Sequence, residues 1–421
     1  MAFTHARIPA IARDPRFRAL CAAQGVSTFG DALTTLTLIL LVTERTHSVP
    51  AVGALTVVIA VPGIVIGLVS GAYADRWDRR RTMIAADVLR AVLLGVLASV
   101  VLLTSALLPV YAIALAEAAV GTLFNPARAA LTQVIVPAGE QVRANSLIQT
   151  TTVVGELAGA TLAGLLVTTL HTYGVSFAVD AVTFGVSAVL IRAIPRSSPV
   201  PAEEHGSTWA AVMDGVRAVR SAPALRALLL VFGALTFALS PMAVLLTPYV
   251  VDTLHISTGW VGLIQSGDTA GNILGGVLIT LVARRVRPRA LIICGMSALA
   301  VLIASFAWTT TVAGLLAAYS VFGLLTVVIQ TGIGAVTQTE VDNALMGRFI
   351  GLMSVVPGIV SVLAMSFSGL AGAALGIRNI FLVSGAVLAT TTALAWRAFH
   401  RASDDGPAPN SPAAAAVTRR S

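Results

Sequence analysis

Six acidic residues lie inside long apolar stretches of this sequence: Asp31, Asp87, Glu117, Glu156, Asp180 and Asp268. A charged side chain at the centre of a membrane costs roughly 2.5 to 3.5 kcal/mol on insertion scales, so each acid needs a partner or a function. A carboxylate withdrawn from water can bind and release a proton near neutral pH. Asp31, Glu156, Glu117 and Asp268 are therefore candidate groups for proton coupling.

The surroundings of these acids differ along the chain. Asp31 lies near the middle of its apolar run, with no arginine within one or two helical turns. A proton-carrying role for Asp31 and a hydrogen bond to a facing Ser or Thr both remain open. Asp87 precedes Arg90 by three residues, a spacing that predicts an ion pair on one helix. Asp180 falls near the outer end of its run, where we expect it to reach water.

A second concentration of charge is the stretch GAYADRWDRRRTM, in which the seven residues from Asp75 to Arg81 hold two carboxylates and four arginines. Gly71 lies one helical turn before Asp75 and shares its face. A small residue lets helices approach closely, and a carboxylate at a helix end can reach the positive N-terminus of a neighbouring helix. The stretch favours a latch between helices, and the alternative is a loop that only fixes topology.

The elements that position these residues must cross a membrane. Of the 421 residues 57% are apolar, and the mean hydropathy is +0.89. One span needs about 20 mainly apolar residues. Twelve such runs occur, at about 19–42, 49–74, 82–103, 108–124, 147–170, 175–194, 225–251, 261–282, 290–308, 312–336, 349–370 and 380–399. The sequence predicts an all-α membrane protein with twelve transmembrane helices.

The arginines predict how these helices are oriented. If the spans alternate in direction, all 27 arginines except Arg45, Arg378 and the intramembrane Arg90 fall on the side that holds both termini. The positive-inside rule makes that side the cytoplasm. We therefore expect a multi-pass protein of the plasma membrane, the inner membrane of a bacterium, with both termini in the cytoplasm.

The chain also divides into two halves. Thr132, Gln133 and Arg143 recur 205 residues later as Thr337, Gln338 and Arg348, which indicates a tandem repeat. Two six-helix bundles are expected, at 1–194 and 225–400. Residues 195–224 read as a cytoplasmic linker with an amphipathic helix on the membrane surface, and residues 401–421 as a flexible cytoplasmic tail.

The absence of lysine excludes whole classes of chemistry. Every basic side chain is arginine, so the chain has neither the lysine of a P-loop nor one for a Schiff base. No enzyme activity, cofactor or metal site is expected. The expected partners are a small-molecule substrate, protons and the lipid bilayer, with no nucleic acid, and the protein is expected to be a monomer.

The stretch GAYADRWDRR resembles the signature loop between spans 2 and 3 of the major facilitator superfamily, in the form found in its drug:proton antiporters, a branch that includes macrolide exporters. The resemblance covers nearly the whole chain and includes RFRAL, GDAL, FNPAR and RANSL. It implies that Asp75, Arg76 and Arg79 hold the two bundles together on the cytoplasmic side in the outward-open state. Gly71 belongs to this gating latch through its spacing from Asp75, and Asp87 and Arg90 are included because they lie close to it.

The fifth span carries GELAGATLAG, residues 155–164, which resembles the antiporter signature of the same family with Ala160 in place of its proline. Independently of that resemblance, small residues at spacing four indicate close helix packing. The predicted helix-packing ridge consists of Gly155, Gly159, Ala163 and Gly164.

The function that these features predict is export of hydrophobic or amphipathic small molecules, such as macrolide-like drugs, by proton antiport through alternating access. Two alternatives remain. A lipid or siderophore exporter or flippase would have the same fold, and a membrane sensor without transport would need a docking surface that the short loops do not offer.

Overall fold

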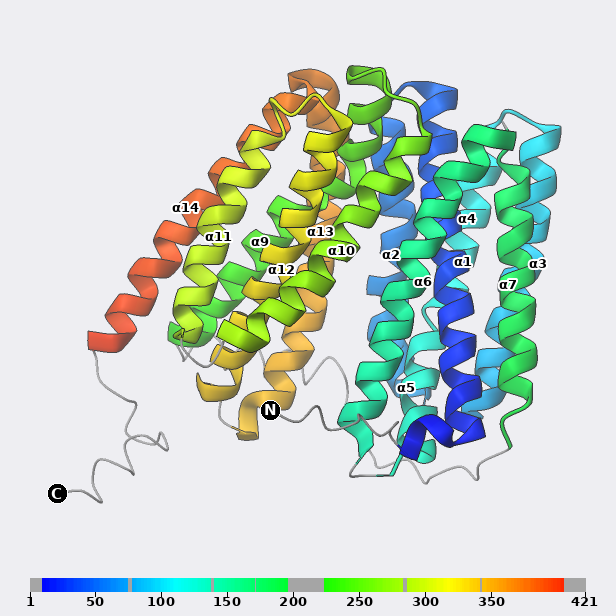
Figure 1. Ribbon diagram of the computed structural model, residues 1–421, viewed down its shortest axis with the longest axis horizontal. Helices are drawn as coiled ribbons and strands as arrows, with labels where there is room; N and C mark the ends of the chain where they lie inside the picture. Colours follow the sequence, from blue (N-terminus) through cyan, green and yellow to red (C-terminus); the bar gives the residue numbers. More distant parts are fainter. Residues whose placement is uncertain are drawn as a thin grey trace, which may run out of the picture. The chain divides into compact units, whose positions relative to one another are not determined.

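The structure, a computed structural model, describes residues 10–74, 78–137, 140–170, 172–195, 223–282, 286–340 and 343–404. Every regular element within these ranges is helical (Figure 1). The predicted all-α architecture is therefore confirmed. The surface helix predicted in the linker and the tail beyond residue 404 lie outside the described residues.

The helices of the first half follow one another through short connections. They are η1 (Ala10–Arg13), α1 (Pro15–Thr46), α2 (Val49–Ala74), α3 (Arg79–Leu103), α4 (Leu107–Gly121), α5 (Phe124–Ile135), α6 (Gln141–Leu170) and α7 (Gly174–Arg192). Those of the second half are α9 (Pro223–Pro248), the π-helical turn η3 (Tyr249–Thr253), α10 (Gly259–Val282), α11 (Pro288–Ser305), α12 (Val312–Glu340), α13 (Asn343–Leu375) and α14 (Ile377–Asp404).

Eleven helical stretches of the described chain are long and apolar enough to cross a membrane, and one of them, Leu107–Ile135, comprises α4 and α5. α10 is the remaining long helix of the predicted twelve. Its first half carries Gln265, Ser266 and Asp268, which lower its apolar character. The span count expected from the sequence therefore agrees with the helices.

Capping residues explain where two of the helices begin. The Asp14 side chain accepts a hydrogen bond from the Arg16 backbone at 2.7 Å, before α1. The Asp78 side chain accepts one from the Arg81 backbone at 3.0 Å, before α3. Each satisfies an amide that the first helical turn leaves without an internal partner. Asp78 therefore has a structural role as the N-cap of α3.

The chain forms two compact units. Unit 1 comprises Met1–His205 with Thr247–Ser266, and unit 2 comprises Gly206–Leu246 with Gly267–Ser421. In unit 1, α1 packs along α6 and α7, and α3 packs along α7 (Figure 1). In unit 2, α11 packs between α12 and α14, around a cluster of aromatic rings formed by Phe306, Tyr319 and Phe381.

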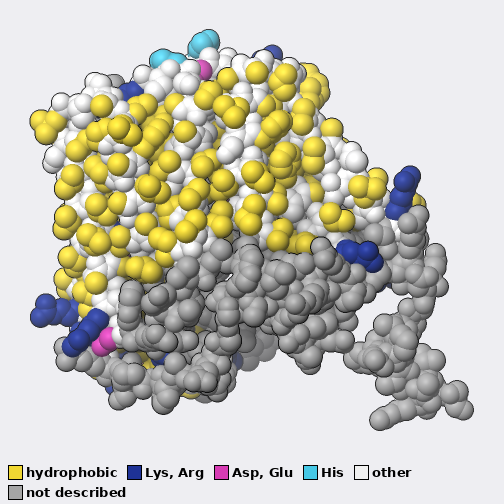
Figure 2. Space-filling model, turned by 180° about the vertical axis from the view of Figure 1, so that it is seen from behind, with side chains coloured by type: hydrophobic (Ala, Val, Ile, Leu, Met, Phe, Trp, Pro, Cys, Tyr) yellow, Lys and Arg dark blue, Asp and Glu magenta, His cyan; other side chains and the backbone are white. Residues whose placement is uncertain are grey.

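Figure 2 shows apolar side chains spread over the visible described surface, with charged and histidine side chains near its edges. Large apolar residues such as Leu103 and Val301 are 85% and 74% exposed. Exposed apolar area of this extent is stable only against lipid. The described surface thus agrees with a chain that crosses a membrane many times.

Candidate functional site

Unit 1 holds an ion cluster around the buried Arg90 of α3. The Arg90 Nε donates to Glu117 of α4 at 2.6 Å, and a terminal nitrogen of the same guanidinium contacts both Glu117 and Asp31 of α1. The Arg90 side chain is buried, whereas the Asp31 side chain is 41% exposed. One guanidinium therefore joins α1, α3 and α4, and one of its two carboxylates remains accessible.

Two further contacts fix the Arg90 guanidinium in place. Its carbon lies 4.0 Å from the centre of the Phe184 ring of α7, a cation–π contact. A Cβ added at Gly121 of α4 would lie 3.3 Å from the same guanidinium carbon, so the absence of a side chain at 121 leaves room for it. The sequence gives no sign of either contact, because Phe184 and Gly121 reach Arg90 only through the packing of α7 and α4 against α3.

Asp87 does not form the predicted ion pair with Arg90. Asp87 is fully buried, and among the described residues both of its oxygens lack a hydrogen-bond partner, although Ser187 of α7 lies nearby. The long Arg90 side chain instead reaches the acids of α1 and α4. A buried carboxylate without donors is costly in its ionised form. Asp87 is thus a buried acid beside the cluster and not the counter-ion of Arg90.

The position of Asp180 also differs from the prediction. Asp180 is fully buried, and it accepts hydrogen bonds from Thr34 at 2.6 Å and from Thr183 at 2.7 Å. Gly30 of α1 makes this burial possible, because a Cβ there would overlap the Asp180 carboxylate. The position of Asp180 near the end of its own apolar run suggested exposure to water. Packing of α7 against α1 buries this side chain instead.

The other two candidate acids are Glu156 of α6 and Asp268 of α10. Glu156 is exposed on α6, and the charge of Asp31 acts on it. Asp268 belongs to unit 2, where α10 approaches α12 so closely that a Cβ at Gly323 would lie 2.7 Å from an Asp268 carboxylate oxygen. Of the four predicted coupling acids, the structure brings Asp31 and Glu117 together on Arg90, with Glu156 within electrostatic range.

The residues of the packing ridge contact two partners. A Cβ at Gly155 would lie 2.7 Å from the Gly25 carbonyl oxygen, and one at Gly159 would overlap the Phe29 carbonyl, so both glycines allow α6 to lie close to α1. Ala163 is fully buried. A Cβ at Gly164 would instead lie 2.8 Å from the Gly259 carbonyl oxygen at the start of α10, within unit 1.

Only part of the predicted latch can be described. Gly71 lies near the end of α2, and Asp75 and Arg76 lie outside the described residues. Arg79, the first residue of α3, donates to the Ala130 carbonyl at 3.5 Å. The neighbouring Arg80 donates to the last carbonyls of α7, at 3.2 Å to Ile191. The arginines at the start of α3 therefore satisfy carbonyls of α5 and α7, a role that the sequence did not reveal.

A second group of polar contacts lies at the C-terminal end of α1. His47 ends this helix in a left-handed conformation, and its Nδ1 lies 2.7 Å from a carboxylate oxygen of Asp252 in η3. These two residues are 205 apart, the same displacement that relates the two sequence halves. Nearby, Tyr173 donates to Glu44, and burial together with this carboxylate raises the pKa of Tyr173, so the phenol stays a donor.

Many long apolar helices with an ion cluster between them are expected of a membrane transporter. Residues 20–364 and 241–420 match the family model of the Major Facilitator Superfamily. The chain belongs to this superfamily, as the sequence resemblance indicated. Its relatives and structural neighbours are transporters and not enzymes.

Two relatives are similar over most of their length. Macrolide efflux protein A of Streptococcus pyogenes is 24% identical over 388 residues, covering 89% of this chain and 93% of that protein. Enterobactin exporter EntS of Escherichia coli O1:K1 / APEC is 25% identical over 345 residues, covering 80% of each. The crystal structure of the nucleoside transporter NupG covers 92% of this chain and 99% of its own, with a TM-score of 0.74 and 15% identity.

Proposed function

We propose that this transporter exports hydrophobic or amphipathic small molecules, of a macrolide-like class, in exchange for protons. The observation that carries the proposal is the sharing of Arg90 between Asp31 and Glu117, with Asp31 partly exposed. When both acids are ionised, the three side chains carry one net negative charge. A proton on Asp31 removes that charge and weakens the attachment of α1 to α3 and α4.

This change in attachment connects proton binding to alternating access. In the proposed cycle, residues 1–194 and 225–400 act as the two bundles, joined by the linker 195–224. Because α1 packs along α6 and α7, a release of α1 would reach both of these helices. The protein is proposed to act as a monomer in the plasma membrane, with both termini in the cytoplasm, in keeping with its arginine distribution.

The Asp31→Asn variant tests this coupling in proteoliposomes loaded with a macrolide. Asparagine keeps the size and most hydrogen bonding of aspartate but cannot titrate. We expect Asp31→Asn to equilibrate the substrate passively and to lose its accumulation against a gradient, at least tenfold, whether or not a proton gradient is imposed. Full gradient-driven export by this variant would exclude Asp31, and Glu156→Gln would be tested next.

Asp14→Asn is the matched control on the same helix. Asp14 caps α1, and asparagine is an equally good N-cap, so the variant removes a charge without removing the cap. Its export should remain normal. If collapsing the proton gradient left export by the unmodified protein intact, antiport itself would be wrong.

A second candidate function is export of a siderophore or a lipid. The similarity to an enterobactin exporter over 80% of both chains supports this second candidate. Purified protein in liposomes separates the candidates, because an exporter of drugs moves a macrolide and leaves labelled phospholipid and catecholate siderophore in place. Movement of either of these without movement of the macrolide would favour the second candidate.

The loop latch is a further part of the proposal. If Asp75 holds the two bundles together, Asp75→Asn should reduce the export rate at least tenfold while the protein still reaches the membrane. Arg81→Ala should have a milder effect, because the resemblance gives Arg81 no role in the latch. Near-normal export by both variants would mean that the loop sets only the orientation of the spans and does not act as a latch.

A further inference from the structure

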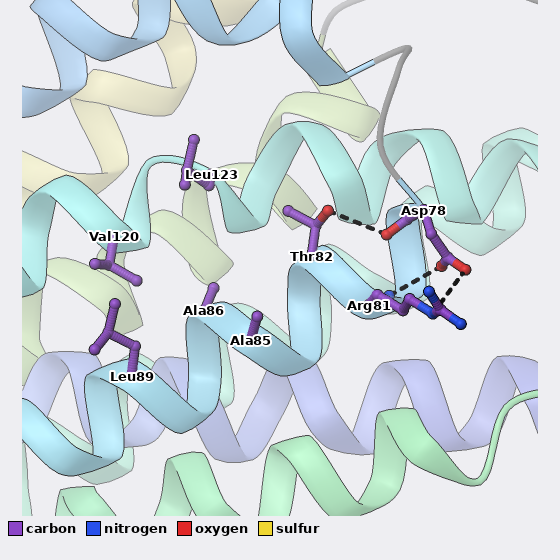
Figure 3. A pocket seen from close by; sticks show the side chains of 8 residues that line it. All are labelled: Asp78, Arg81, Thr82, Ala85, Ala86, Leu89, Val120 and Leu123. Carbon is purple, nitrogen blue, oxygen red and sulfur yellow. Dashed lines mark hydrogen bonds and ion pairs between the residues drawn. The ribbon is translucent and has the colours of Figure 1, made fainter.

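A groove of about 470 Å³ runs along α3 from its first turn, on the side that faces the junction of α4 and α5. Asp78, Arg81 and Thr82 line one end, and Ala85, Ala86, Leu89, Val120 and Leu123 line the rest (Figure 3). From Arg81 to Leu89 the helix rises about 12 Å. The groove thus has a polar end and an apolar floor that extends toward the middle of the bilayer.

The three arginines at this end of α3 have different partners. Arg79 and Arg80 donate to backbone carbonyls of α5 and α7. Arg81 lies on the groove with its side chain 66% exposed, and its Nε is 3.6 Å from an Asp78 carboxylate oxygen. Among the described residues its terminal nitrogens have no further partner. Arg81 therefore offers free donors at the polar end of the groove.

The local charge at this end is positive despite Asp78. The Asp78 carboxylate caps the helix by accepting from the Arg81 backbone at 3.0 Å. Asp78 lies at the positive end of the α3 dipole and is followed in sequence by three arginines, Arg79 to Arg81. A positive rim above an apolar floor is complementary to a molecule with an anionic head and an apolar chain.

We propose that this groove binds an anionic phospholipid of the leaflet next to the arginine-rich loops. The phosphate accepts hydrogen bonds from Arg81, and an acyl chain lies along Ala85, Leu89 and Val120. A leaflet has an apolar depth of about 15 Å, half of the hydrocarbon core, which matches a floor of about 12 Å. Leu89, which lines the groove, is 47% exposed, in keeping with access from lipid.

Native mass spectrometry of the purified full-length protein in detergent, with added phosphatidylglycerol, tests the charged end. Arg81→Gln should weaken phosphatidylglycerol retention about fivefold, the loss expected for one arginine at an anionic surface. Retention of phosphatidylcholine, which has no net charge, should be weaker than that of phosphatidylglycerol in the unmodified protein.

Arg143→Gln is the matched control. Arg143 is 67% exposed and lies 3.4 Å from Glu140 three residues earlier, so it resembles Arg81 in exposure and pairing but does not line this groove. Its lipid retention should equal that of the unmodified protein. Equal losses in the two variants, or none in Arg81→Gln, would overturn the proposal.

Ala85→Trp tests the apolar floor without changing the charge. Ala85 is exposed along the groove, so a larger side chain there fills the groove without entering the protein core. We expect this variant to lose phosphatidylglycerol retention while its thermal unfolding is unchanged. Normal retention by Ala85→Trp would contradict the proposal even if Arg81→Gln proved too unstable to purify.

Discussion

Replacement of Arg90 by methionine should abolish gradient-driven export and lower the stability of the protein by about 3 to 5 kcal/mol, the cost of leaving a buried charge without its partner. The Arg90 guanidinium is the shared partner of Asp31 and Glu117. Without it, two carboxylates face each other with no neutralising group. Thermal unfolding in detergent and transport in proteoliposomes measure the two effects separately.

Lysine should not rescue this position. Arg90 contacts Glu117 through Nε and a terminal nitrogen while it also contacts Asp31, and a single ammonium group cannot reproduce this planar arrangement. Arg143→Gln again provides a control, because the Arg143 side chain is 67% exposed and its 3.4 Å ion pair with Glu140 should contribute little.

A triple variant separates stability from transport. When Arg90→Met is combined with Asp31→Asn and Glu117→Gln, no ionised group is left in the cluster, so most of the lost stability should return. Export against a gradient should remain absent, because the titratable carboxylates are gone. Stability that stays low, or coupled export that returns, would show that the cluster does not act as the proposed charge-balanced unit.

The sequence predicted the helices well because the length of an apolar run is a local property. Runs of about 20 apolar residues correspond to helices, and even α10, whose first half carries several polar residues, lies where its run was expected. The helix-capping Asp78 has a recognisable position before α3, yet its role was overlooked because the loop was interpreted through its charge alone.

Ion partners could not be predicted in the same way. Asp31 and Arg90 are 59 residues apart, and Arg90 and Glu117 are 27 apart, so each contact depends on how whole helices pack. The sequence predicted Asp87 as the ion partner of Arg90, because a sequence shows only the spacing of residues along one helix. The burial of Asp180 likewise required knowledge that Gly30 of α1 lies against it.

Gly159→Ala should separate α6 from α1 and reduce both stability and export. An added Cβ would overlap the Phe29 carbonyl and lie 3.1 Å from the Ala32 Cβ. The clash is mainly with backbone, so a rotamer change of one flexible side chain cannot relieve it. Overpacking of this kind typically costs about 1 to 3 kcal/mol, although alanine itself favours a helix over glycine.

Gly95→Ala on α3 is the control, because a Cβ there meets no atom within 4 Å among the described residues. With no clash, the higher helix propensity of alanine should leave stability unchanged or raise it by up to about 1 kcal/mol. The two substitutions are chemically identical, so opposite shifts in thermal unfolding would arise from packing alone. A Gly159→Ala variant as stable and as active as Gly95→Ala would mean that α1 and α6 do not need this close approach, and the packing role of the ridge would have to be abandoned at this position.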